Sequence, residues 1–159
     1  MASNFSIRHA AHIIRRGGII AYPTDTIYGL GCNPYDETAV SRLNAIKQRP
    51  PDKQFILLAE NIEQIKPLVS LNEKQQEIIK QADKPTSWVA PAKSSAPAWL
   101  VNNDNTLCFR ICKQNDVRRL CHNLGHAIIS TSANLSGKPP ATNALELHRY
   151  FHHSLDMIM

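Results

Sequence analysis

Two segments of the chain concentrate side chains that could bind an anionic substrate. The first, residues 47–53 (KQRPPDK), places the cations Lys47, Arg49 and Lys53 within seven residues, around two prolines. Cations on a stiff segment suit a polyphosphate, because little conformational freedom remains to be lost on binding. The alternative is a charged helix end exposed to solvent. Taken alone, the cluster favours this alternative over a phosphate site.

The second segment, residues 130–142 (STSANLSGKPPAT), follows the apolar residues 127–129 directly. A simple connection needs only a turn, whereas this one is rich in hydroxyl and amide side chains. In α/β sheets ligands bind at strand ends, so these groups are candidates for holding a nucleotide. The alternative is a turn whose side chains satisfy their own backbone.

Several other chemistries lack their motifs. Neither a Walker A sequence nor G-x-G-x-x-G is present, so a nucleotide would have to be held by side chains. Without H-E-x-x-H or a C-x-x-C pair, the pattern does not favour zinc, and we expect no protein metal site and free thiols at all four cysteines. Without G-x-S-x-G, no nucleophilic triad can be assigned.

Composition places the chain among ordinary globular proteins. It has 159 residues, of which 43% are hydrophobic and 19% charged, enough for one domain with its own core. The net charge of +5 suits an anionic partner such as a nucleotide or RNA. No apolar run is long enough to span a bilayer, and the N-terminus lacks a signal-peptide core. We therefore expect a cytoplasmic protein with no membrane partner.

Strands and helices are expected to alternate along the chain. Hydrophobic patterns and capping residues predict strands over 19–22, 55–59, 87–92, 106–111 and 127–130, and helices over 6–16, 36–47, 61–69, 72–82, 115–125 and 143–151. Residues 154–159 show strand-like spacing. The alternation predicts a three-layer α/β domain.

Four segments, in this order, resemble the YrdC/TsaC family, the threonylcarbamoyl-AMP synthases. They are PTDTIYGLGC (23–32), KQRPPDK (47–53), LCFRI (107–111) and STSANLSGKPPAT (130–142), and the resemblance covers nearly the whole chain. It implies one YrdC-like domain over 1–159, with a twisted, mixed, largely parallel sheet and helices on both faces. Two departures stand out. Lys84 replaces the glycine of a PGP-x-T motif, and the family's closing C-terminal tail is missing, so we expect a truncated domain.

The resemblance also implies a reaction. Such enzymes are nucleotidyltransferases that combine L-threonine, bicarbonate and ATP into threonylcarbamoyl-AMP and pyrophosphate. A transfer complex then passes the threonylcarbamoyl group to adenosine 37 of tRNA, and double-stranded RNA is a further partner. The family needs no prosthetic group, and Mg²⁺ is expected to accompany ATP.

Carried onto this sequence, the resemblance assigns ten binding residues and no side-chain nucleophile. Threonine would be bound by Thr26, Leu58, Arg110 and Ser132. ATP would be bound by Lys47, Arg49, Lys53, Thr106, Asn134 and Thr142. Two alternatives stay open: a non-catalytic RNA-binding domain, and a YciO-like relative with a different substrate.

Overall fold

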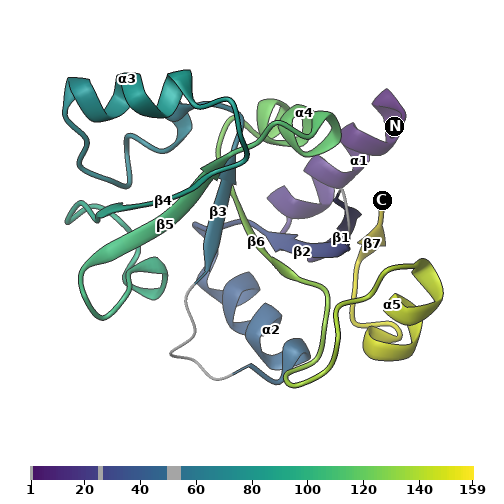
Figure 1. Cartoon of the computed structure of the whole chain (residues 1–159). Coiled ribbons are helices and arrows are strands. Elements are labelled where there is room, and N and C mark those ends of the chain that lie inside the picture. Colours follow the sequence, from purple (N-terminus) through teal and green to yellow (C-terminus); the bar gives the residue numbers. More distant parts are fainter. Residues whose placement is uncertain (1, 25–26, 50–54) are drawn as a thin grey trace.

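The computed structural model describes residues 2–24, 27–49 and 55–159. In this part of the chain a mixed seven-stranded sheet has the order β4-β5-β3-β6-β2-β1-β7 (Figure 1). The strands are β1 (Ile20–Pro23), β2 (Tyr28–Cys32), β3 (Ile56–Ala59), β4 (Ser87–Pro91), β5 (Thr106–Ile111), β6 (Ile128–Ser132) and β7 (Met157–Ile158). The mixed α/β class predicted from the sequence is confirmed.

The expectation of a largely parallel sheet was wrong. Among the described strands only β3–β5 and β1–β7 pair in parallel, whereas β1–β2, β2–β6, β3–β6 and β4–β5 are antiparallel. One cause is β2, which lies within a segment predicted to be a polar loop. Its sequence YGLGC contains two glycines, which are depleted in strands, so strand propensity does not reveal it.

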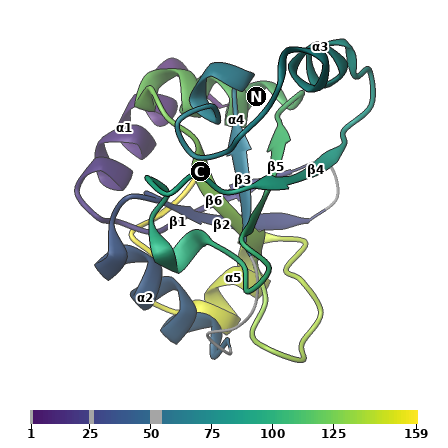
Figure 2. The ribbon, with the colours of Figure 1, turned by 90° about the vertical axis from the view of Figure 1, so that its left-hand side faces the viewer.

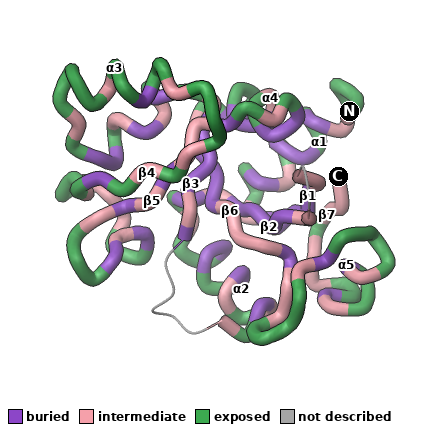
Figure 3. Tube along the Cα trace, in the orientation of Figure 1, coloured by how far each residue is buried: buried purple, intermediate pink, exposed green. Residues whose placement is uncertain are grey.

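Helices cover the two faces of the sheet. The α-helices are α1 (Asn4–Arg15), α2 (Glu37–Lys47), α3 (Glu73–Gln81), α4 (Asn115–Leu124) and α5 (Ala144–Phe151). Helices α1 and α4 pack side by side and share one core with Ile20, Tyr22 and Ile128 of the sheet (Figures 1 and 2). Helices α2, α3 and α5 contribute to a larger core on the opposite face. The three expected layers are therefore present, and Figure 3 shows the buried residues between them.

Capping residues account for most of the helix ends. The Asp36 carboxylate accepts the Ala39 N–H at the start of α2, and Asn72 forms a capping box with Gln75 at the start of α3. Gly125 ends α4 with φ of 80°, a conformation that favours glycine. The predicted cap Asn115 was one residue late, because Gln114 accepts the Val117 N–H instead.

The helix predicted over 61–69 was also wrong. Only the 3₁₀ helix η1 (Ile62–Gln64) forms there, followed by turns and a bridge from Val69 to Ala92. The apolar residues of this segment are nevertheless buried, so their spacing reported burial correctly but not the helix type. A second 3₁₀ helix, η2 (Ala98–Leu100), lies in the polar loop before β5.

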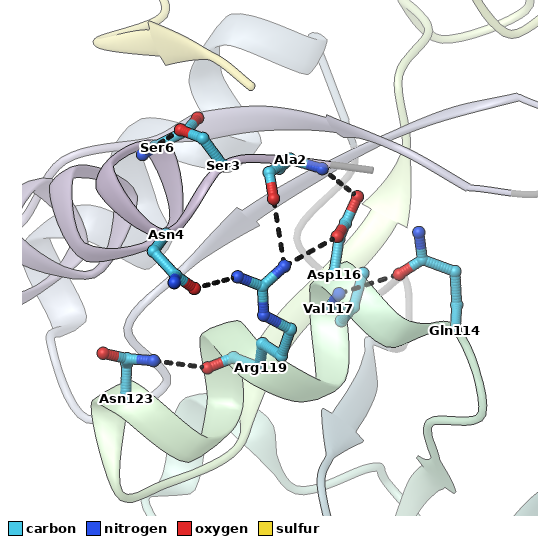
Figure 4. Close-up of polar contacts among 9 residues, drawn as sticks. All are labelled: Ala2, Ser3, Asn4, Ser6, Gln114, Asp116, Val117, Arg119 and Asn123. Atoms are coloured by element: carbon cyan, nitrogen blue, oxygen red, sulfur yellow. Dashed lines mark hydrogen bonds and ion pairs between the residues drawn. The ribbon is translucent and has the colours of Figure 1, made fainter.

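The first residues of the described chain are fastened to α4 (Figure 4). Asp116, only 5% exposed, accepts the Ala2 N–H at 2.8 Å and lies 3.4 Å from Nη1 of Arg119. The same Arg119 nitrogen donates to the Ala2 carbonyl at 3.0 Å, while Nη2 donates to the Asn4 amide oxygen. This network holds α1 against α4 by polar contacts in addition to the apolar ones.

Replacing Asp116 by alanine should therefore destabilise the fold. The substitution leaves the partly buried Ala2 N–H and the Arg119 cation without their buried carboxylate, which costs roughly 1.5–3 kcal/mol of unfolding free energy. Urea unfolding measures the loss. The matched control is the exposed Asp83, whose change to alanine should stay within about 0.5 kcal/mol of wild type. Equal stability of the two variants would contradict the role given to Asp116.

No helix in the described residues is both long and apolar enough to cross a bilayer.

Candidate functional site

The candidate site lies on one face of the sheet, beyond the area that α1 and α4 cover. Strand register places Leu58 opposite Arg110, Ile56 opposite Ser130, and Gly29 opposite Ser132. Paired residues, and residues two apart on one strand, point to the same face of a sheet. Three neighbouring strands, β5, β3 and β6, therefore present Arg110, Leu58, Ser130 and Ser132 together, although the strands are far apart in the sequence.

A cavity of about 310 Å³ opens on this face, and we call it the amino-acid cavity. Its lining joins β5, β3, β6 and the segment before β2, and contains Leu58, Arg110 and Ser132. Three of the four residues predicted to bind threonine thus meet in one cavity. The fourth, Thr26, lies outside the described residues.

Arg110 is oriented by Ser87, a residue outside the set of predicted site residues. The Ser87 hydroxyl on β4 accepts a hydrogen bond from Nη2 of Arg110 at 2.8 Å and a longer one from Nε at 3.3 Å. The two residues are direct partners in the β4–β5 pairing. Ser87 lies three residues after Lys84, in the segment 82–88 that corresponds to the PGP-x-T motif. A small hydroxyl side chain near that motif was the one sequence feature that could have indicated its role.

Lys84 itself lies away from the amino-acid cavity. It lines a separate cavity of about 380 Å³, together with Lys80, Trp88 and Lys113. Strand register puts Trp88 and Ile111, which also lines that cavity, on the opposite face of the sheet from Arg110. The departure at Lys84 therefore does not alter the lining of the amino-acid cavity.

A smaller cavity of about 160 Å³ adjoins the amino-acid cavity, and we call it the phosphate cavity. Its lining includes Lys47, Arg49 and Asn134, three of the predicted ATP residues, and it shares Thr131 and Ser132 with the amino-acid cavity. A molecule that fills both cavities would pass over these two residues. Lys53, the third predicted cation, lies outside the described residues.

Lys47 connects α2 to the Ser/Asn loop, residues 130–142. It is only 4% exposed, and its ammonium donates to the Ser132 carbonyl, to the Asn134 carbonyl at 2.8 Å and to the Asn134 amide oxygen at 3.3 Å. The Ser136 N–H returns a hydrogen bond to the Lys47 carbonyl at 3.0 Å. Lys47 is thus a structural cation of the loop as well as a predicted phosphate contact.

Arg49 lies at the edge of the same cavity. Its Nη1 donates to the Thr131 hydroxyl at 3.2 Å, and its guanidinium carbon lies 4.7 Å from the centre of the Phe55 ring. Partial burial lowers the pKa of Arg49 from its ordinary value, but an arginine remains charged at neutral pH. The stacked guanidinium therefore presents a fixed positive charge, which suits a phosphate.

The Asn134 side chain organises the loop from inside. Its amide oxygen accepts from the Ser132 hydroxyl at 2.6 Å, and its nitrogen donates to the carbonyls of Leu135 and Lys138, both at 3.0 Å. Both amide protons are therefore engaged within the loop, as expected for a turn that satisfies its own backbone. In this arrangement Asn134 shapes the phosphate cavity, and Lys47 and Arg49 supply its positive charge.

The remaining predicted ATP residues, Thr106 and Thr142, line neither of the two cavities. The Thr106 hydroxyl donates to Asp104 at 2.6 Å at the start of β5, four residues or about 13 Å along the strand from Arg110. Thr142 precedes α5, and both its N–H and its hydroxyl donate to Glu146, at 2.7 and 3.1 Å. Their contact with ATP stays a prediction.

The four cysteines carry no nucleophile at neutral pH. All are free thiols. Burial raises the pKa of Cys32 and of Cys112 to about 12, and raises the pKa of Cys108 and Cys121 as well. These thiols therefore stay protonated, and the three buried ones, Cys32, Cys112 and Cys121, behave as small core residues.

Comparison with known proteins identifies relatives of this chain. A sequence profile of the Sua5/YciO/YrdC family, described as "Telomere recombination", matches residues 12–159. The threonylcarbamoyl-AMP synthase of Cellvibrio japonicus is 41% identical over 157 residues, which make up 98% of this chain and 83% of that protein.

Two solved structures share the fold. P. abyssi Sua5 complexed with L-threonine matches with a TM-score of 0.89 and 31% identity over 99% of this chain. The chain spans about half, 47%, of that Sua5 chain. E. coli YciO matches with a TM-score of 0.85 and 25% identity, covering 99% of this chain and 78% of YciO.

Proposed function

The chain belongs to the Sua5/YciO/YrdC family, and we propose that it is an L-threonylcarbamoyl-AMP synthase. The observation that carries this function is the junction of the two cavities at Thr131 and Ser132, with Arg110 in the amino-acid cavity and Lys47 and Arg49 in the phosphate cavity. A carboxylate-binding arginine and a pair of phosphate-binding cations match an amino acid joined to a nucleotide. The threonine complex of P. abyssi Sua5 supports the amino acid.

The reaction needs alignment and not a protein nucleophile. The amine of threonine and bicarbonate give a carbamate and water, and a carbamate oxygen then attacks the α-phosphorus of ATP. Pyrophosphate leaves, and the product is threonylcarbamoyl-AMP, so the enzyme acts as a nucleotidyltransferase. The contribution of Lys47 and Arg49 is to fix the phosphates and to offset the charge that develops on the leaving group.

Mg²⁺ enters this proposal as the ion carried by ATP. Among the described residues no three His, Cys, Asp or Glu side chains gather as metal ligands, so they do not form a resident metal site. Mg²⁺ is commonly held by phosphate oxygens and water, with few protein ligands. No prosthetic group takes part.

The product would be consumed by a transfer complex that modifies adenosine 37 of tRNA, and we place the reaction in the cytoplasm, where ATP and tRNA are available. The two alternatives are weaker. The YciO structure is 25% identical to this chain, whereas the Cellvibrio synthase is 41% identical. A non-catalytic RNA-binding domain, including one for double-stranded RNA, would not require an amino-acid cavity beside a phosphate cavity.

Pyrophosphate release from ATP is expected only when L-threonine and bicarbonate are both present. The reason is that neither substrate alone yields the carbamate that attacks the phosphorus. Coupled pyrophosphate detection measures the rate, and mass spectrometry identifies the adenylate. L-serine in place of threonine tests the amino acid. Release at the full rate in bicarbonate-free buffer would contradict the carbamate route.

A further inference from the structure

Tyr22 is a fully buried residue whose hydroxyl contacts Ser130, a residue that lines the amino-acid cavity. Its O–H donates to the Ser130 hydroxyl oxygen at 2.5 Å, and Ser130 lines that cavity. The rest of the ring packs in the core beneath α1 and α4. Tyr22 thus contacts the lining of the amino-acid cavity through its hydrogen bond to Ser130.

The glycines of β2 make this contact possible. A Cβ atom on Gly29 would lie 2.9 Å from Cε2 of the Tyr22 ring, and one on Gly31 would lie 3.0 Å from Cε1. Such distances are too short for carbon atoms that are not bonded. The side chains of β2 alternate, so Leu30 and Cys32 point into the core on the opposite face of the sheet. On the near face Gly29 and Gly31 have no side chain, and the Tyr22 ring packs directly against their backbone.

The hydrogen bond fixes the direction of the serine proton. In this hydrogen bond the Tyr22 hydroxyl is the donor, and burial, which raises the pKa of Tyr22 far above its ordinary value, keeps the proton that it donates. A serine hydroxyl that accepts this bond keeps its own O–H for another acceptor. Within the described residues no protein group accepts that proton, and the hydroxyl borders the cavity.

Ser130 also has a fixed backbone. It lies on the central strand β6, paired with Gly31 on one side and with Ile56 on the other. The register puts Arg110 two strands away, on β5. Ser132 lies two residues after Ser130 on β6 and lines the phosphate cavity. Ser130 therefore lies between the group that suits a carboxylate and the groups that suit phosphates.

We propose that the Ser130 hydroxyl binds a carbamate oxygen of the threonine-derived intermediate, and that Tyr22 is the positioning residue that aims its proton. The carbamate is the group that must lie between the amino-acid carboxylate and the α-phosphorus, which is where Ser130 stands. A donor held in place before the substrate arrives needs no reorganisation during the reaction. This inference rests on the proposed synthase function.

The test compares Ser130→Ala, Tyr22→Phe and the double variant in steady-state kinetics with bicarbonate varied at saturating threonine and ATP. Ser130→Ala should lower kcat/KM for bicarbonate roughly tenfold, the size expected for one hydrogen bond to a charged group. Tyr22→Phe keeps the ring and removes only the donor, so a smaller loss in the same direction is expected. The double variant should be no worse than Ser130→Ala, because Tyr22 acts only through Ser130.

Two further variants separate this role from simple packing. Ser130→Thr retains the hydroxyl and should keep the bicarbonate dependence close to wild type. Tyr35→Phe removes a tyrosine hydroxyl outside both cavities and should change nothing. A purely structural role would shift thermal unfolding without a selective effect on bicarbonate. Wild-type bicarbonate dependence in Ser130→Ala, or additive losses in the double variant, would overturn the proposal.

If the wild-type chain makes no adenylate, the synthase function fails, and calorimetry still decides on Ser130. Threonine is titrated into wild type and Ser130→Ala, with and without bicarbonate. A gain in threonine affinity with bicarbonate that is lost in Ser130→Ala supports the carbamate contact. The same response in both proteins, including none, refutes it.

Discussion

Arg110→Ala is expected to raise the KM for L-threonine roughly 100-fold, with little change in ATP affinity. A guanidinium can donate two parallel hydrogen bonds to a carboxylate, and their loss costs about 3 kcal/mol. Arg110 is the arginine of the amino-acid cavity, and it does not line the phosphate cavity. Steady-state kinetics with threonine varied, together with ATP titration calorimetry, measures both effects.

Two further variants test the role of the Arg110 guanidinium. Arg110→Lys keeps the charge but loses the planar pair of donors, so it should recover only part of the threonine affinity. Ser87→Ala removes the hydroxyl that orients the guanidinium and should raise the threonine KM by less than Arg110→Ala does. An Arg110→Ala enzyme with an unchanged threonine KM would remove Arg110 from the binding site.

Lys47→Met is expected to weaken both ATP binding and the fold. Methionine retains most of the aliphatic length but leaves the oxygens of Ser132 and Asn134 without the ammonium that they now share. Unsatisfied buried acceptors cost about 1–3 kcal/mol each, so we expect a loss of roughly 2–4 kcal/mol in unfolding free energy. The loss of the charge should weaken ATP binding by about 1.5–3 kcal/mol.

Arg49→Met provides the matched control, because it removes a cation from the same cavity. Arg49 is half-buried and reaches Thr131 and the Phe55 ring instead of the loop carbonyls. Its replacement should weaken ATP binding by a similar amount while costing about 1 kcal/mol or less of stability. Chemical unfolding and ATP calorimetry on both variants test the contrast. Equal stability losses would contradict the loop-anchoring role of Lys47.

Hydrophobic periodicity and capping residues predicted those helices and strands that depend on residues close together in the sequence. The strand over 106–111 has the bounds that the sequence predicted, and the starts of α2 and α3 follow from Asp36 and Asn72. A side chain that caps its own helix acts over three residues, so its effect can be read without the fold. Strand direction is different, because it depends on a partner that is distant in the sequence.

The same distinction applies to the candidate site. The sequence identified Lys47, Arg49 and Asn134 as site residues, and all three line the phosphate cavity. It did not separate their tasks, since the contacts that bind Lys47 to the loop span 85 and 87 residues. Ser87 and Tyr22 were missed for a related reason: each acts through a partner on another strand.

By itself, the amino-acid sequence determined the α/β class, most helix and strand positions and the family's site motifs, because these depend on periodicity, caps and short runs of residue types. The fold alone set the antiparallel pairings, the strand hidden in YGLGC, and the meeting of Arg110 with Ser132 across β5, β3 and β6. The physical reason is that hydrogen bonds between strands and the burial of a ring on glycines join residues that local propensity cannot relate. The side chains of the site supply its charges and hydroxyl groups, and the pairing of the strands sets the distances between those side chains.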